Sequence, residues 1–244
     1  MGATWQSARV DEIDYLTTLH GLQDEFLATI PLVDPRAPVP ACAPWRVRDL
    51  VVHLARVHHW AAGRARRKPE TPLGRGPFDL VELYAACAAE LRDTLQELGP
   101  DAPATTLIGP GPASFWHRRQ VHETLVHLWD LRTSTGLDAD ADARIWADGV
   151  DEVVTMFEPR QVRMGRIAPL ARGVALMADD ADGTWLLGSH QPAAPVTHAD
   201  VTVTGPAKAL SLVLWHRQAP DEAGVAISGD RTALDDALAT RITP

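Results

Sequence analysis

The sequence predicts a mostly helical N-terminal domain followed by a small α+β domain. Apolar residues recur every three or four positions through most of the first 160 residues, as in amphipathic helices. From Gly173 onward the pattern changes to short strand-like runs separated by turn residues. We therefore expect a helical bundle over residues 1–160 and a small α+β unit over residues 161–244.

The helices of the predicted bundle are each about 20 residues long and are separated by stretches rich in proline or glycine. Leu19, Leu22 and Phe26 illustrate the helical spacing in the first of them. Gly136 is expected to end the last one as a C-cap. The long connections between these helices favour a four-helix bundle whose helices are loosely connected. The four helices are expected over residues 10–30, 45–66, 79–98 and 113–134.

A shorter helix over residues 142–157 is expected to join the two halves of the chain. The second half then alternates between strands and helices, with a turn-forming run of aspartates at residues 179–183. Strands are expected at residues 174–178, 184–187, 201–204 and 225–227, and helices over 206–217 and from 232 onward.

The composition excludes several classes of protein. Among 244 residues no apolar run approaches the roughly 18 residues that a membrane span needs. The net charge of −9 disfavours nucleic acid as a partner. The acidic first 15 residues do not read as a signal peptide, so a cytoplasmic protein is expected, as a monomer or a homodimer. Cys42 and Cys87 are too few for a disulfide scaffold and are expected to pack as small apolar residues.

One helix carries a polar stripe. Arg119, Glu123 and His127 follow one another at intervals of four and so share one face of the helix over residues 113–134. Such groups need partners wherever the helix is buried. A carboxylate and an imidazole on one face supply two ligands of a metal such as zinc. His122 and His127 are five positions apart, which excludes the HExxH spacing of zinc peptidases.

A third ligand must come from another helix, and His53 is the best candidate. It lies on the apolar stripe of the helix over residues 45–66, beside Leu50 and Leu54. Three protein ligands would leave one coordination position open, as in catalytic zinc sites. From spacing alone, a satisfied core histidine and a local surface pair of Glu123 and His127 remain open alternatives. His58 and His59 are expected to face solvent near the helix end.

Two segments resemble one known family. Trp45-Arg-Val-Arg-Asp-Leu-Val-Val-His-Leu and Phe115-Trp-His-Arg-Arg-Gln-Val-His-Glu-Thr-Leu-Val-His-Leu-Trp-Asp are similar to segments of the mycothiol-dependent maleylpyruvate isomerases, which belong to the DinB-like metal-binding four-helix bundles. Later segments, at residues 147–152, 214–217 and 225–230, are similar to the family's inter-domain and C-terminal signatures. The chain departs from the family pattern at Leu128, where the family has an arginine.

The resemblance implies which residues form the site. By it, His53, Glu123 and His127 fall on the family's metal ligands, and Arg217 falls on an arginine needed for activity. Arg217 and Arg119 are then the candidates for binding the cofactor, while a charge at a helix end remains the alternative for Arg217. Asp130 either orients His127 or is a surface charge. The C-terminal unit is expected to resemble sterol-carrier-like folds.

The resemblance also implies a chemistry. Zn²⁺, or another divalent metal, would bind the thiol of mycothiol and stabilise its thiolate for attack on a small electrophilic substrate. Addition to a cis alkene followed by elimination would make the protein an isomerase, and displacement of a leaving group would make it an S-transferase. A metal-dependent hydrolase with metal-bound water and a non-catalytic ligand-binding protein are the alternatives.

Overall fold

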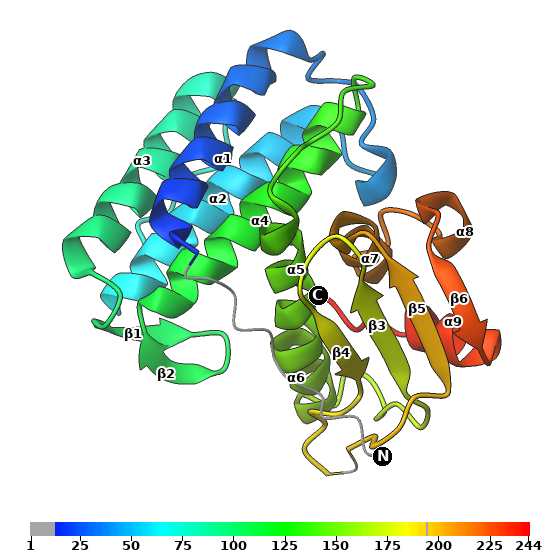
Figure 1. Cartoon of the computed structure of the whole chain (residues 1–244). Helices are drawn as coiled ribbons and strands as arrows, with labels where there is room; N and C mark the ends of the chain where they lie inside the picture. Colours follow the sequence, from blue (N-terminus) through cyan, green and yellow to red (C-terminus); the bar gives the residue numbers. More distant parts are fainter. Residues whose placement is uncertain (1–12, 194) are drawn as a thin grey trace. The chain divides into compact units, whose positions relative to one another are not determined.

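The computed structural model describes residues 13–193 and 195–244, which divide into two compact units, residues 13–140 and residues 141–244. The boundary expected from the sequence lies later, between residues 160 and 161. The difference arises from α5 (Ala143–Glu152), the helix expected to join the two halves. It packs along α7 (Ala207–Leu214) and so belongs to the C-terminal unit (Figure 1). Among the described residues, no helix is long and apolar enough to cross a bilayer.

Residues 13–140 fold as the predicted helical bundle, with helices that run alongside one another (Figure 1). Helix α2 packs against α3 and α4, and α1 packs against the same two helices. Asp14 and Asp79 cap the first turns of α1 and α3 by accepting hydrogen bonds from the backbone N–H groups of Thr17 and Glu82, both at 3.0 Å. The long helices are α1 (Tyr15–Thr29), α2 (Val47–Arg66), α3 (Leu80–Leu98) and α4 (Ser114–Thr133). Residues 10–12 of the first expected helix lie outside the described residues.

The bundle core is apolar except where α4 brings polar groups into it. Leu50, Leu54 and Leu125 are fully buried, and the Phe26 and Tyr84 rings stack with their centroids 4.6 Å apart. The buried polar side chains of α4 require hydrogen-bond partners from neighbouring helices, because an unpaired buried polar group costs about 1–3 kcal/mol.

His58 is one of those partners, so the expectation that it faces solvent is wrong. Helix α2 continues well past it, and its side chain is fully buried between α3 and α4. Its Nδ1–H donates to Oε1 of Gln120 at 2.8 Å, and the Tyr84 hydroxyl donates to its Nε2 at 3.4 Å. Burial lowers the pKa of His58 to about 4, so it stays neutral. His59 is also partly buried and is hydrogen-bonded to Glu90.

A small hairpin precedes α4 where the sequence indicates only a loop. Strands β1 (Pro103–Thr106) and β2 (Gly109–Pro112) pair in antiparallel register. The Trp116 indole donates to the carbonyl of Thr105 at 3.0 Å, which joins the hairpin to α4. Pro103, Pro110 and Pro112 concealed the hairpin, because proline has no backbone N–H to donate and so argues against a strand.

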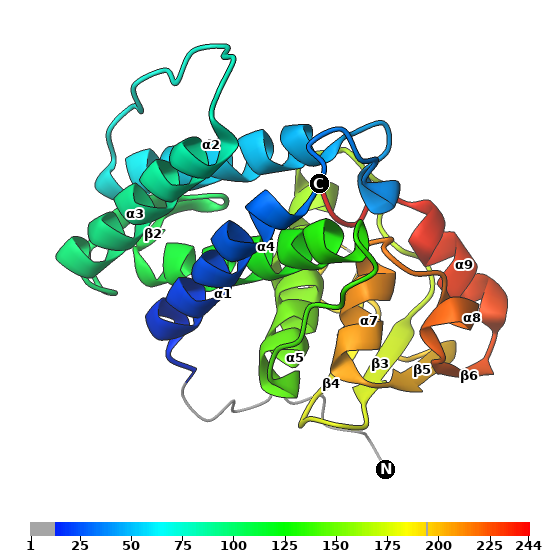
Figure 2. The ribbon, with the colours of Figure 1, turned by 90° about the horizontal axis from the view of Figure 1, so that it is seen from above.

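The C-terminal unit is built on a four-stranded sheet of order β4-β3-β5-β6. The β3–β4 and β5–β6 pairs are antiparallel, and the β3–β5 pair is parallel. Helices α7 and α9 (Arg231–Ala239) contact β3 and β5, and the short helix α8 (Pro220–Ala223) follows α7 (Figures 1 and 2). The strands are β3 (Val174–Ala178), β4 (Thr184–Leu187), β5 (Val201–Gly205) and β6 (Ala226–Gly229). The mostly helical N-terminal domain and the sheet-containing C-terminal domain are confirmed.

Helix α5 continues through a π-helical turn, η3 (Val153–Phe157), into α6 (Glu158–Arg163). This longer helical path buries Glu158 completely, and neither of its carboxylate oxygens has a hydrogen-bond partner among the described residues. Burial raises the pKa of Glu158 to about 7 from its ordinary 4.5.

We predict that Glu158→Gln removes a pH-dependent loss of stability. Below pH 4.5 the wild-type carboxyl is protonated in both states, whereas between 4.5 and about 7 only the folded state keeps the proton. Folding stability is therefore lost as the pH rises through this window, on the order of 3 kcal/mol in total. Urea denaturation at pH 4.5 and pH 8 should show E158Q gaining this amount relative to wild type between the two pH values.

Asp182→Asn is the matched control, because it removes an exposed carboxylate from the same unit. Its stability relative to wild type should change little with pH. An E158Q variant whose relative stability is the same at both pH values would contradict the burial of an unpartnered Glu158 carboxyl.

Candidate metal centre

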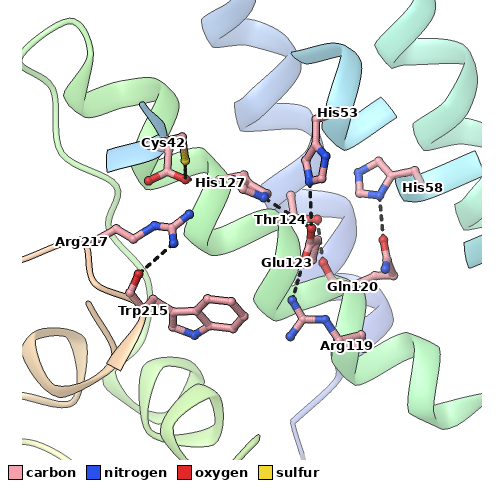
Figure 3. Close-up of polar contacts among 11 residues, drawn as sticks. Cys42, His53, His58, Arg119, Gln120, Glu123, Thr124, His127, Trp215 and Arg217 are labelled. Atoms are coloured by element: carbon pink, nitrogen blue, oxygen red, sulfur yellow. Dashed lines mark hydrogen bonds and ion pairs between the residues drawn. The ribbon is translucent and has the colours of Figure 1, made fainter. Parts of the chain in front are cut away.

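Three side chains from two helices point toward one another in the bundle (Figure 3). His53 comes from α2, and Glu123 and His127 come from successive turns of α4. Oε1 of Glu123 lies 3.5 Å from Nε2 of His53 and 3.4 Å from Nε2 of His127. The ligand atoms all lie within 4.8 Å of one another. The structure thus brings together the three residues that the sequence analysis selects as metal ligands.

The spacing of these atoms fits a bound zinc ion. Zinc lies about 2.0–2.2 Å from nitrogen and oxygen ligands. In a tetrahedral site this places neighbouring ligand atoms about 3.4 Å apart, close to the two separations from Oε1 of Glu123. Two imidazoles and one carboxylate are also a ligand set found in catalytic zinc sites. The His53 side chain is 35% exposed, so the cluster is accessible from outside the bundle.

Arg119 holds Glu123 from the opposite side. Its buried guanidinium donates to Oε2 of Glu123, one helical turn away, while Oε1 faces the two histidines. Burial by itself would raise the pKa of Glu123, but the charge of Arg119 and the hydrogen bonds from His127 and His53 outweigh it and hold that pKa well below its usual value. Glu123 is therefore a carboxylate at neutral pH, as a metal ligand must be.

His127 is held through its other ring nitrogen. Its Nδ1–H donates to Oδ2 of Asp130 at 2.8 Å, and Asp130 is fully buried. When a metal binds at Nε2, this bond would keep the proton on Nδ1 and leave the Nε2 lone pair to the ion. Burial would lower the pKa of His127, but its hydrogen bonds to Asp130, Cys42 and Glu123 raise it well above its usual value. Asp130 orients His127, and the alternative of a helix-surface charge is wrong because Asp130 is not exposed.

Cys42 is a contact that the sequence analysis missed. Its thiol donates to the same Oδ2 of Asp130 at 3.3 Å, so it is not simply a packed apolar residue. It belongs to η2 (Pro40–Cys42), in the proline-rich segment before α2, where no periodic pattern signals its direction. Cys42, His127 and Asp130 form a second group that could hold a metal. The hydrogen bonds within that group favour a supporting role behind His127. Cys87 is buried, as expected, and burial raises the pKa of its thiol to about 11.

Arg217 belongs to the C-terminal unit. Helix α7 ends at Leu214, before the expected end at 217, and His216 adopts a left-handed conformation with φ of 57°. Arg217 is half-buried, its Nη1 donates to the carbonyl of Trp215 at 2.8 Å, and its guanidinium lies 5.9 Å from the centre of the Trp215 ring. The guanidinium is thus held against the backbone and an aromatic face in the turn after the helix.

Two family models match the chain in the order of its two units. The Mycothiol maleylpyruvate isomerase N-terminal domain matches residues 16–132, and the C-terminal domain of the same family matches residues 144–236. Among curated relatives, an uncharacterized protein from two strains of Mycobacterium tuberculosis is 29% identical over 143 residues, which are 54% of this chain and 74% of the relative.

Solved structures share the fold. The crystal structure of the mycothiol-dependent maleylpyruvate isomerase superposes with a TM-score of 0.64, and that of a histidine-to-alanine mutant of that enzyme with a TM-score of 0.60. Each is 19% identical to this chain and covers 89% of it and 93% of the solved chain.

We predict that His53→Ala severely lowers the zinc content of the purified protein. The substitution removes one of the three ligands and leaves only the pair from α4. The side chain is half-buried rather than central to the core, so helical content measured by circular dichroism should be nearly unchanged. Elemental analysis after dialysis against limiting zinc measures the difference.

His59→Ala provides the control on the same helix. His59 contacts Glu90 and the carbonyl of Thr71 and does not belong to the cluster. It should keep wild-type zinc content. Full zinc retention by H53A would remove His53 from the ligand set.

Proposed function

Since the chain belongs to the mycothiol-dependent maleylpyruvate isomerase family, we propose that it is an enzyme that presents the thiolate of mycothiol to a small electrophilic substrate at a divalent metal, with zinc as the best fit. The cluster of His53, Glu123 and His127 is the observation that carries this proposal. A non-catalytic ligand-binding protein would have no need of two imidazoles and a carboxylate aimed at one point.

Bound zinc would supply a Lewis acid that lowers the pKa of a coordinated thiol. The chain's own residues supply the preorganisation. Arg119 compensates the charge of Glu123 and fixes its orientation, and Asp130 fixes the ring of His127. A ligand set held by such partners pays little for ordering when a metal binds.

The same contacts favour a thiol over water as the nucleophile. A zinc hydrolase needs a general base beside the metal-bound water, commonly a carboxylate. Here Glu123 is itself a proposed ligand, and Asp130 lies behind His127, bonded to its Nδ1. A thiol has a free pKa of about 8.5 and needs no such base. The arrangement therefore suits thiol chemistry better than the alternative of water activation.

Two reactions fit this site. Isomerisation of a cis alkene conjugated to a carbonyl returns the thiol unchanged. S-transfer joins the thiol to the substrate carbon and releases a leaving group and a proton. Arg217 is proposed to act in either reaction by binding a carboxylate or carbonyl group of the cofactor, because its planar fork matches such groups. Arg119 is buried and bonded to Glu123, so its contribution to cofactor binding is proposed to act through that ligand.

We predict that turnover requires the thiol. Zinc-loaded protein should isomerise a cis alkene conjugated to a carbonyl, or form a thioether from 1-chloro-2,4-dinitrobenzene, with mycothiol present and at most marginally without it. Spectrophotometry follows the substrate, and mass spectrometry of the thiol distinguishes its return from its consumption. Equal rates with and without mycothiol would favour the hydrolase and end the proposal.

We also predict that Arg217→Ala lowers the turnover rate with mycothiol by tenfold or more. The guanidinium contributes charge-assisted hydrogen bonds, each worth about 1.5–3 kcal/mol. Zinc content and melting temperature should change little, because Arg217 belongs to the other unit from the ligands and is half-buried. Arg163→Ala, at an exposed position of the same unit, is the control and should leave turnover intact. Wild-type turnover by R217A would exclude the assigned role.

A further inference from the structure

A cleft of about 700 Å³ opens in the N-terminal bundle beside the proposed metal centre. Its lining comes from the first half of α2, from the segment that connects α2 to α3, and from Pro35, Trp45 and Leu80. In Figure 2 the connecting segment, residues 67–79, loops out from the helices. His53 is the member of the metal cluster that also lines this cleft. The volume is in the range of sites for small organic ligands.

The cleft has an apolar wall. Trp45, Val52 and Phe78 line it, together with two prolines and Leu80. The Trp45 ring lies against the ring of His53, with centroids 4.7 Å apart. An apolar surface therefore leads directly to the proposed ligand His53. Burying a flat apolar group here would gain about 25 cal/mol for each Å² removed from water.

The charged residues in the lining are Arg48, Asp49, Arg56 and Arg75. Asp49 is already engaged: its Oδ2 accepts from the backbone N–H of Arg46 at 2.9 Å, and its Oδ1 lies 3.8 Å from Nε of Arg48. Arg56 and Arg75 have no carboxylate partner anywhere in residues 13–193 and 195–244. The cleft therefore carries an excess of positive charge, although the whole chain has a net charge of −9.

Arg56 is also fixed in place. Its Nη2 donates to the carbonyl of Gly74 at 2.7 Å, and its guanidinium lies 5.9 Å from the centre of the Phe78 ring. These contacts join α2 to the connecting segment that carries Arg75. One guanidinium is thus preorganised, and the remaining donors of its fork are available to an anion.

We propose that this cleft binds the substrate as an organic monoacid with a flat apolar body, whose carboxylate pairs with Arg56 and Arg75 while the body packs on Trp45 and Phe78. A ligand seated in this way extends toward His53. The inference rests on the proposed function for the role of His53 as a metal ligand, and it narrows the electrophile to an apolar-bodied unsaturated carboxylic acid. A compact diacid would leave the apolar wall uncovered, and its second carboxylate would add a further desolvation cost.

Binding measurements without any thiol test this inference independently of turnover. Isothermal titration calorimetry would use trans-cinnamate, the neutral cinnamamide and the compact dianion maleate as probes. The titrations would be run on zinc-loaded protein and on chelator-treated, metal-free protein, because an open zinc coordination position could itself bind a carboxylate. We expect cinnamate to bind both forms of the protein, and to bind at least tenfold more tightly than cinnamamide or maleate.

Variants of the lining locate the binding site. Arg75→Ala should weaken cinnamate binding about tenfold or more, the effect of one charge-assisted hydrogen bond, and leave cinnamamide binding unchanged. Lys68→Ala removes an exposed charge from the same connecting segment outside the cleft and should bind cinnamate as wild type does. Arg56→Ala should weaken cinnamate binding as well, and its circular dichroism spectrum checks that the bundle is intact.

Equal affinity for cinnamate and cinnamamide would overturn the proposal, as would maleate binding as tightly as cinnamate or wild-type cinnamate affinity in R75A. Loss of cinnamate binding in the metal-free protein would show that the metal binds the anion, and would overturn the proposal too. None of these outcomes bears on the thiol requirement, which is measured with other substrates. A failure of the proposed substrate binding in the cleft can therefore be distinguished from a failure of the proposed thiol-dependent function.

Discussion

The ring of His127 is held at both of its nitrogens in the interior of the bundle, and the proposed site depends on this arrangement. Nδ1 donates to the fully buried Asp130, and Nε2 lies 3.4 Å from Oε1 of Glu123. A buried imidazole with an unpaired nitrogen would cost about 1–3 kcal/mol. The neighbours of His127 are therefore fixed by the folding of α4 itself, before any metal or substrate binds. Arg119 extends the same chain of contacts to the far oxygen of Glu123.

The packing of α2 against α4 supplies the third of the proposed metal ligands, which α4 alone cannot provide. Glu123 and His127 share a face of α4, but a third ligand has to arrive from a second helix at the correct height. The bond between His58 of α2 and Gln120 of α4 helps to fix that height, since it is buried and lies five residues from His53 and three residues from Glu123. His53 then reaches Glu123 while one side of its ring remains open toward the cleft. Stability and site geometry thus share the same buried polar contacts.

The proposed metal and the proposed substrate would contact two different sides of His53. The cluster side offers nitrogen and oxygen ligands to a metal, and the cleft side offers an apolar wall and two arginines without carboxylate partners among the described residues. The metal would hold the nucleophile, and the cleft would hold the acid that it attacks. Because the two surfaces use different residues apart from His53, substitutions can separate substrate binding from metal binding.

The sequence by itself determined the long helices and the local half of the site. Apolar periodicity marks α1 and α3, and spacings of four place Arg119, Glu123 and His127 on one face, because helix geometry depends only on distance along the chain. The apolar stripe of the second helix made His53 the best candidate for the third ligand, and the resemblance to a known family supported that choice. Only the tertiary structure decided that His58 is buried, that the proline-containing residues 103–112 pair as a hairpin and that Cys42 reaches Asp130 across 88 positions of sequence. Such contacts depend on how whole segments pack, and packing leaves no periodic signal in the residues that make them.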